Sequence, residues 1–180
     1  MAKAAASRRG WWGSGVMAGP ETAGQPIPAP RHQWPRCLLA VDAREVRTAA
    51  EQFEQAFRIE DVQLPQSGLG LMKIRDGALG ELYFPGEIPL ATARVRMLAA
   101  DQTWYEGAAQ LMDDRASLAR AIAVLDGVLA NQLPGHETLI PLLQKGQNRL
   151  AAQAKERKAL LETTRVNFSS LGHYEEDDHA

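Results

Sequence analysis

Residues 59–111 divide into short runs with a two-residue period, separated by residues that favour turns. In residues 92–99 apolar side chains alternate with Thr92, Arg94 and Arg96, so one face of an extended chain is apolar and the other is charged. Alternation with short connections predicts an antiparallel sheet whose second face meets solvent or a partner. The predicted strands are 59–64, 69–75, 81–84, 92–99 and 103–111, and the predicted turns are 65–68, 76–77, 85–86 and 101–102.

Before this region, the apolar residues of 43–57 recur three and four apart, which predicts an amphipathic helix. Asp42 can act as its N-cap, with Glu45 three residues on in the arrangement of a capping box. A short helix precedes it. Because proline is tolerated only in the first turn of a helix, Pro35 requires that helix to start at about Trp34.

After the predicted sheet, a broad apolar stripe over residues 118–129 predicts a helix that can bury itself on the sheet, capped by Asp113 or Asp114. Helices and an antiparallel sheet in this order predict an α+β fold. We expect an antiparallel sheet of four or five strands covered by helices.

Residues 137–168 predict a long C-terminal helix that breaks after Lys145 and Gly146, a possible C-cap, and restarts near Asn148. A helix with a thin apolar stripe is marginal alone, since most helical stability comes from packing an apolar face. We therefore expect this helix to lie across the domain or against another chain. Its stripe consists of Leu150, Ala154 and Leu161.

Composition divides the chain into three parts. Residues 1–30 are rich in Ala, Gly and Pro without periodicity and are predicted to be a disordered extension. Residues 31–170 are predicted to form one domain, and residues 171–180 an acidic tail that includes Glu175, Glu176, Asp177 and Asp178.

Charge and cysteine content exclude several classes of protein. The net charge is −2 and no basic face is concentrated, so we expect no nucleic-acid partner. The single cysteine, Cys37, excludes an intrachain disulfide, and a cluster built on several thiolates of this chain alone. No apolar run approaches the roughly 20 residues that span a bilayer, so we expect no membrane association and a cytoplasmic protein.

A search for catalytic patterns finds no phosphate-binding loop, no nucleophile elbow and no zinc-protease motif. The four histidines stand apart from carboxylates and thiols at metal-ligand spacing. The sequence therefore predicts no catalytic residue, no cofactor-binding residue and no metal ligand in this chain.

Four residues are candidates for partner or phosphate contacts. Arg94 and Arg96 share a strand face and could bind a triphosphate or an acidic partner surface, although exposed strand faces normally carry charges. Arg165 and Phe168 could anchor an interface, because arginine and aromatic residues are enriched in hot spots, or could tie down the C-terminus.

Three segments in the same order resemble the PhnG family, a subunit of the bacterial carbon-phosphorus lyase core complex. The resemblance covers roughly residues 31–170. It departs before and within the third helix, where the family has a glycine turn and a glutamate and this chain has Asp113, Asp114, Arg115 and Arg120. The similar segments are 80–87 leading into 93–97, the helix 118–129, and 137–168, which starts ETLIPL and ends TRVNF.

The resemblance implies an accessory subunit in phosphonate catabolism. PhnG proteins act with PhnI and PhnH, and with PhnL, to join ATP to a phosphonate such as methylphosphonate, releasing adenine and forming α-D-ribose 1-methylphosphonate 5-triphosphate. PhnJ belongs to the same core complex. Another subunit later breaks the carbon-phosphorus bond with S-adenosylmethionine and an iron-sulfur cluster. ATP is thus a substrate of the complex, and no cofactor is expected on this chain alone.

Two other functions stay open at this point. The chain could be an enzyme whose nucleotide site contains Arg94 and Arg96, which micromolar ATP binding by the purified chain would support. It could also be an interaction module unrelated to phosphonates. The sequence does not decide the phosphonate specificity, the subunit stoichiometry or whether translation starts at Met1 or Met17.

Overall fold

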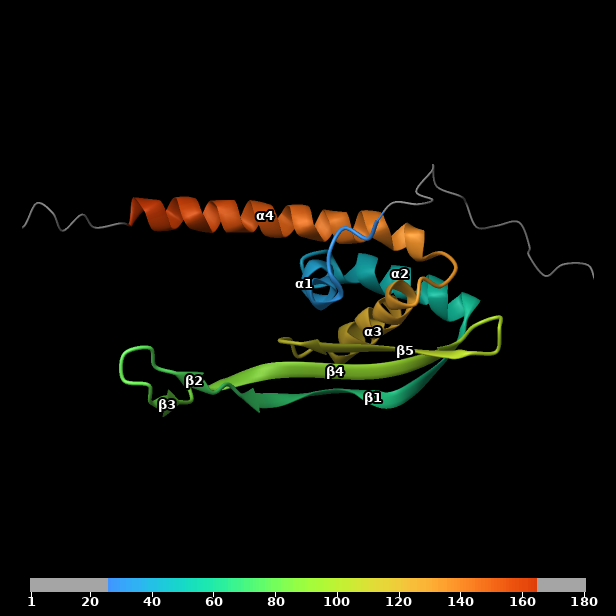
Figure 1. The fold of residues 1–180 in the computed structure, drawn as a ribbon, viewed down its shortest axis with the longest axis horizontal. Helices are drawn as coiled ribbons and strands as arrows, with labels where there is room; N and C mark the ends of the chain where they lie inside the picture. Colours follow the sequence, from blue (N-terminus) through green and yellow to red (C-terminus); the bar gives the residue numbers. More distant parts are fainter. Residues whose placement is uncertain (1–25, 165–180) are drawn as a thin grey trace, which may run out of the picture.

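The computed structural model describes residues 26–164, which form an α+β arrangement in layers (Figure 1). An antiparallel sheet lies on one side, three helices cover it, and a long helix lies across those helices. The elements are η1 (Arg31–Gln33), α1 (Trp34–Leu39), α2 (Ala43–Ala56), β1 (Arg58–Leu71), β2 (Ile74–Arg75), β3 (Leu82–Tyr83), β4 (Glu87–Leu98), β5 (Trp104–Leu111), α3 (Ala116–Ala130), η2 (His136–Leu139) and α4 (Ile140–Thr163).

The α+β prediction is confirmed, with one correction to the sheet. The main sheet has three strands in the order β1-β4-β5, with both neighbouring pairs antiparallel. The predicted strand at 81–84 is not part of it, because β3 pairs only with β2 in a separate two-stranded sheet. The five strands found in residues 26–164 thus form two sheets instead of one sheet of four or five strands.

The predicted turn at 65–68 is wrong. β1 runs through it from Arg58 to Leu71 and pairs with β4 along its whole length. Register shifts between Asp61 and Gln66 interrupt this pairing, and Pro65 lies within them. Proline is tolerated there because β1 is an edge strand, on which a missing N–H need not break a ladder.

β4 has the predicted alternation and forms the floor of the core. Val95 and Met97 are fully buried beneath the helices, whereas Arg94 and Arg96 point outward. α3 lies on this inner face and is apolar nearly all round, with Ile122 and Leu125 also fully buried. Such a helix suits a central position in the core.

The start of α2 is as predicted, but the capping box is not. Asp42 accepts a hydrogen bond from the Arg44 amide at 2.7 Å, which is worth about 1 kcal/mol to a helix. Glu45 instead binds the Lys145 ammonium of α4, with oxygens at 2.6 and 2.8 Å. The acid of the predicted box therefore links two helices.

α3 begins differently from the prediction. Its N-cap is Arg115, which makes no side-chain cap, and the Asp113 carboxylate binds the Arg115 guanidinium and amide instead. Within the helix, Gly127 lies against Gly107 of β5. A Cβ on Gly107 would lie 2.1 Å from the Ala123 carbonyl oxygen, so glycine is required for this close packing of helix on strand.

α4 is continuous from Ile140 to Thr163, so the predicted break after Gly146 is wrong. Gly146 is buried inside the helix, where its missing side chain lets α4 approach the backbone of α1. Only the first part of α4 is covered, and its residues from Ala151 onward are exposed.

Candidate partner-binding surfaces

β1 and β4 extend beyond β5 and form a ribbon of their own. β5 pairs with β4 from Leu98 as far as Ala91, whereas β1 pairs with β4 as far as Glu87. The ribbon continues into the β2–β3 hairpin. We call residues 66–90 the ribbon arm; it projects from the helical part of the molecule (Figure 1).

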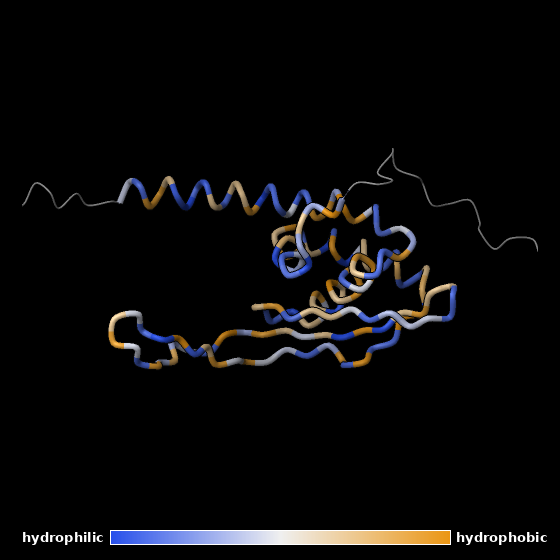
Figure 2. The backbone as a smooth tube through the Cα atoms, viewed as in Figure 1, coloured by the Kyte–Doolittle hydropathy of each residue, from blue (hydrophilic) through white to orange (hydrophobic). Residues whose placement is uncertain are grey.

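The ribbon arm exposes large apolar side chains. Hydrophobic residues recur along it in Figure 2, and those on β1 are two-thirds exposed. A two-stranded ribbon is marginally stable in water, and exposed apolar groups of this density mark interaction surfaces. The exposed residues are Leu69, Leu71, Leu79, Leu82, Tyr83 and Phe84.

The second half of α4 forms a helical arm that extends in the same direction as the ribbon arm (Figure 1). Its surface is mainly hydrophilic in Figure 2, but Leu160 and Leu161 are 69% and 64% exposed. The thin apolar stripe predicted from the sequence is therefore buried at one end only: Leu150 packs on the core, whereas Leu161 is exposed to solvent.

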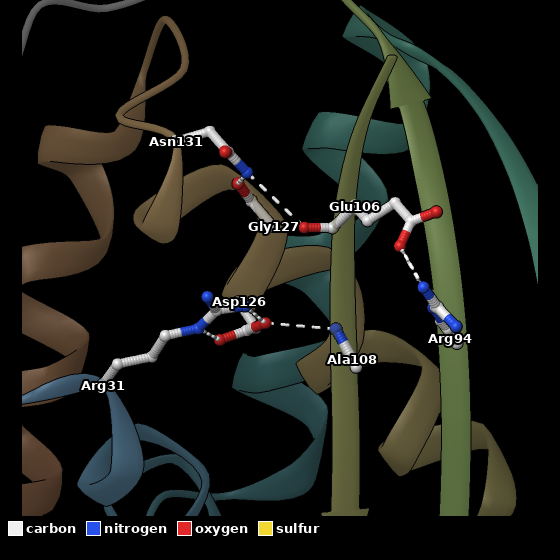
Figure 3. Close-up of polar contacts among 7 residues, drawn as sticks. All are labelled: Arg31, Arg94, Glu106, Ala108, Asp126, Gly127 and Asn131. Atoms are coloured by element: carbon white, nitrogen blue, oxygen red, sulfur yellow. Dashed lines mark hydrogen bonds and ion pairs between the residues drawn. The ribbon is translucent and has the colours of Figure 1, made fainter.

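The structure places Arg94 and Arg96 on the outer face of the sheet, each beside a carboxylate. Arg96 donates to Glu60 of β1 at 2.6 and 3.0 Å, and Arg94 donates to Glu106 of β5 from Nε at 3.1 Å (Figure 3 draws the second pair). These hydrogen bonds from Arg96 lower the pKa of Glu60. Both guanidinium groups thus have an anionic neighbour.

An aromatic ring adds to this outer face. The Arg96 guanidinium carbon lies 4.5 Å from the centre of the Trp104 ring, and that of Arg58 lies 5.9 Å from it. Cations stacked on tryptophan are held in place by the ring's negative face. Sequence reasoning missed this contact, although Trp104 and Arg96 lie on strands predicted to be neighbours. The other two predicted contacts, Arg165 and Phe168, lie outside residues 26–164.

A buried carboxylate fixes the start of the domain. Asp126 of α3 is 4% exposed and accepts two hydrogen bonds from Arg31, at 2.9 and 2.7 Å, and one from the Ala108 amide at 3.1 Å (Figure 3). Sequence reasoning passed over it. The sequence did contain an indication of this contact, because Asp126 is the single acid within the apolar stripe 118–129. A buried carboxylate needs a hydrogen-bond or ion-pair partner.

The side chain of Arg120 in α3 joins three elements. It donates from Nε to Asp61 of β1 at 2.7 Å and also pairs with Glu54 of α2. A long cation in α3 thus ties α2 to the strand that follows it.

The chemistry available in the described residues is limited. Within 26–164, no group of three or more His, Cys, Asp and Glu side chains could hold a metal ion. Cys37 is 1% exposed, and burial raises the pKa of its thiol, which favours the unreactive protonated form. No helix between residues 26 and 164 has the length and apolarity needed to cross a membrane.

Comparison with known proteins gives one family. A family model described as "Phosphonate metabolism protein PhnG" matches residues 29–172, which is most of the chain. A search of curated proteins found no match.

Proposed function

The chain belongs to the PhnG family of phosphonate metabolism proteins, and on that premise we propose that it is an accessory, non-catalytic subunit of a multi-subunit transferase. In this proposal its partners are the PhnI, PhnH and PhnJ homologues, with PhnL, in the cytoplasm. The assembled complex forms α-D-ribose 1-methylphosphonate 5-triphosphate from ATP and methylphosphonate and releases adenine.

The observation that carries this proposal is the uncovered ribbon arm. Leu69, Leu71 and Leu79 are 68%, 68% and 78% exposed, on a ribbon with neither a third strand nor a helix packed on it among residues 26–164. Burial of such residues contributes roughly 25 cal/mol per Å² of apolar surface, so a covering subunit gains much of its affinity here. In the proposal, the arm is covered by a sister subunit.

The proposal gives this chain a binding role and leaves bond-making to its partners. The outer-face arginines support that division, because Arg94 and Arg96 are already engaged by Glu106 and Glu60. An anion would have to displace a carboxylate from each of them. We propose that these two arginine–glutamate pairs make polar contacts with a partner subunit, and that Arg165 and Phe168 anchor the chain in the same assembly.

The test is assembly and turnover with variants of the arm. The chain is co-expressed with the PhnI, PhnH and PhnJ homologues of its source, and PhnL is added for turnover. L69S/L71S is expected to lower co-purification and adenine release at least tenfold, because the polar side chains remove the apolar contact. M112S is the matched control, since Met112 is 64% exposed but lies outside both arms.

Two results would refute the proposal. A purified chain that releases adenine from ATP and methylphosphonate unaided is an enzyme, not an accessory subunit. A L69S/L71S variant that assembles as well as the wild type removes the arm from the interface.

A further inference from the structure

A groove runs between α1 and α4, on the side of the molecule away from the sheet. Two adjoining hollows of about 530 and 230 Å³ share Arg36 and Leu150 as lining residues. Leu161 gives the far end an apolar wall, and Arg157 and Lys158 lie beside it. We call this the α1–α4 groove.

The positive charge of the α1–α4 groove is only weakly compensated within residues 26–164. No acidic residue lines either hollow, and within residues 26–164 neither Arg36 nor Arg157 forms an ion pair. The carboxylate nearest to Lys158 is that of Glu162, 3.8 Å away, at the limit of an ion pair. Arg94 and Arg96 on the sheet, by contrast, each have a carboxylate partner. A groove with apolar walls, two arginines outside any ion pair among the described residues and one weakly paired lysine fits an acidic peptide.

Charge also distinguishes between the two ends of this chain as occupants. Residues 1–25 carry Lys3, Arg8 and Arg9 against the single acid Glu21, so the groove repels them. The opposite end carries four consecutive acids at 175–178, the longest acidic run in the sequence.

The C-terminal segment can reach the groove. α4 ends at Thr163, and the 12 residues from there to Glu175 span on the order of 40 Å when extended. Arg157 lies about 9 Å back along the helix axis from Thr163, and Leu150 about 20 Å, at 1.5 Å per residue. The acids can therefore return along the whole groove while α4 stays intact.

We propose that residues 175–178 bind in the α1–α4 groove of the same chain, with their carboxylates on Arg36, Arg157 and Lys158. Each such pair is weak alone, but the tether holds the acids near the groove at an effective concentration on the order of millimolar. The groove is thereby occupied in the isolated subunit. Salt is expected to weaken this binding.

Carbodiimide cross-linking tests this, because the reagent joins a carboxylate to a lysine amine only when they touch. Lys155 and Lys158 are both exposed on α4, but only Lys158 lines the groove. In the full-length chain carrying E162Q, which removes the neighbouring acid, cross-links from 175–178 to Lys158 are expected to exceed those to Lys155 at least fivefold. R36Q/R157Q or 0.5 M salt should abolish this preference, whereas R44Q/R47Q, which removes two charges elsewhere, should not.

An equal mixture of ¹⁴N and ¹⁵N chains identifies the source of the cross-link. Peptide pairs of a single isotope show that the segment binds its own chain, as proposed. Mixed-isotope pairs, or equal yields at Lys155 and Lys158, overturn the proposal. The experiment uses the isolated chain, so it leaves the proposed phosphonate role untested and is independent of it.

Discussion

Gly146 packs against Cys37 so closely that a Cβ on the glycine would lie 2.1 Å from the Cys37 carbonyl oxygen. The contact joins two helices more than 100 residues apart in the sequence, and it holds the first part of α4 on α1. A glycine that looked like the end of a helix is the point where two backbones meet.

Gly146→Ala is expected to destabilise the protein, since the added methyl forces α4 away from backbone atoms that cannot rotate aside. Overpacking costs about 1–3 kcal/mol, and this outweighs the gain of about 1 kcal/mol that alanine brings to a helix. Urea unfolding measures the difference. Gly68→Ala, which has open space around its Cβ, should stay within about 0.5 kcal/mol of the wild type. A stabilised G146A would contradict the packing.

Asp126→Ala is expected to lower the free energy of unfolding by about 1–3 kcal/mol, because it removes the hydrogen bonds that the Ala108 amide and the Arg31 guanidinium donate to this buried carboxylate. Arg115→Gln is the comparison. This variant breaks the local ion pair between Arg115 and Asp113. Because the Arg115 side chain is 49% exposed, the free energy of unfolding should fall by at most about 1 kcal/mol. If both variants unfold at the same urea concentration, Asp126 is not a structural anchor.

Arg96→Gln is expected to raise the pKa of Glu60 toward its ordinary value of 4.5, because Arg96 is the main cause of its depression. A depressed carboxylate pKa stabilises the fold above the ordinary pKa, and this stabilisation is lost as the pH falls through the folded-state pKa. The stability difference between wild type and R96Q should therefore be constant above about pH 5.5 and shrink below pH 4.5. Carboxyl NMR titration of Glu60 checks the shift. A pKa unchanged in R96Q would contradict it.

Leu160→Ser with Leu161→Ser should leave thermal unfolding nearly unchanged, since both side chains are about two-thirds exposed. The same double variant is expected to weaken co-purification with the sister subunits, because the helical arm loses its two exposed leucines. A K155Q variant on the same arm, measured alongside, shows what a charge change alone does. A marked drop in melting temperature for L160S/L161S would mean that the arm packs on its own domain.

Micromolar ATP binding to the isolated chain is not expected, because a phosphate at Arg94 or Arg96 must compete with Glu106 or Glu60. Isothermal titration gives the answer. Affinity in the micromolar range that falls in R94Q/R96Q would favour a nucleotide-binding enzyme over an accessory subunit.

Local patterns in the sequence predicted the elements whose signal is local. The alternation around Val95 and the cap at Asp42 need only neighbouring residues, and both are confirmed. The predictions that were wrong concern residues whose secondary structure depends on contacts with a segment distant in the sequence. Pro65 lies in a strand because β4 pairs along the whole of β1, and Gly146 lies within a helix because α1 packs against it. No short window contains either partner.

The candidate surfaces were only partly predictable for the same reason. Outward-facing Arg94 and Arg96 follow from strand periodicity, but their pairing with Glu106 and Glu60 depends on strand order and register. The ribbon arm could not be predicted, since it depends on where the neighbouring strands end: β5 stops at Leu111, opposite Ala91, whereas β1 continues to Leu71, opposite Glu87.

The side chains that α3 sends to β5 also limit how copies of this protein can aggregate. The Ala108 amide donates to Asp126 and the Glu106 carbonyl accepts from Asn131, so two backbone groups on the free edge of β5 are occupied (Figure 3). A strand that added to β5 at these residues would have to displace both side chains, which opposes amyloid-like stacking along this part of the sheet.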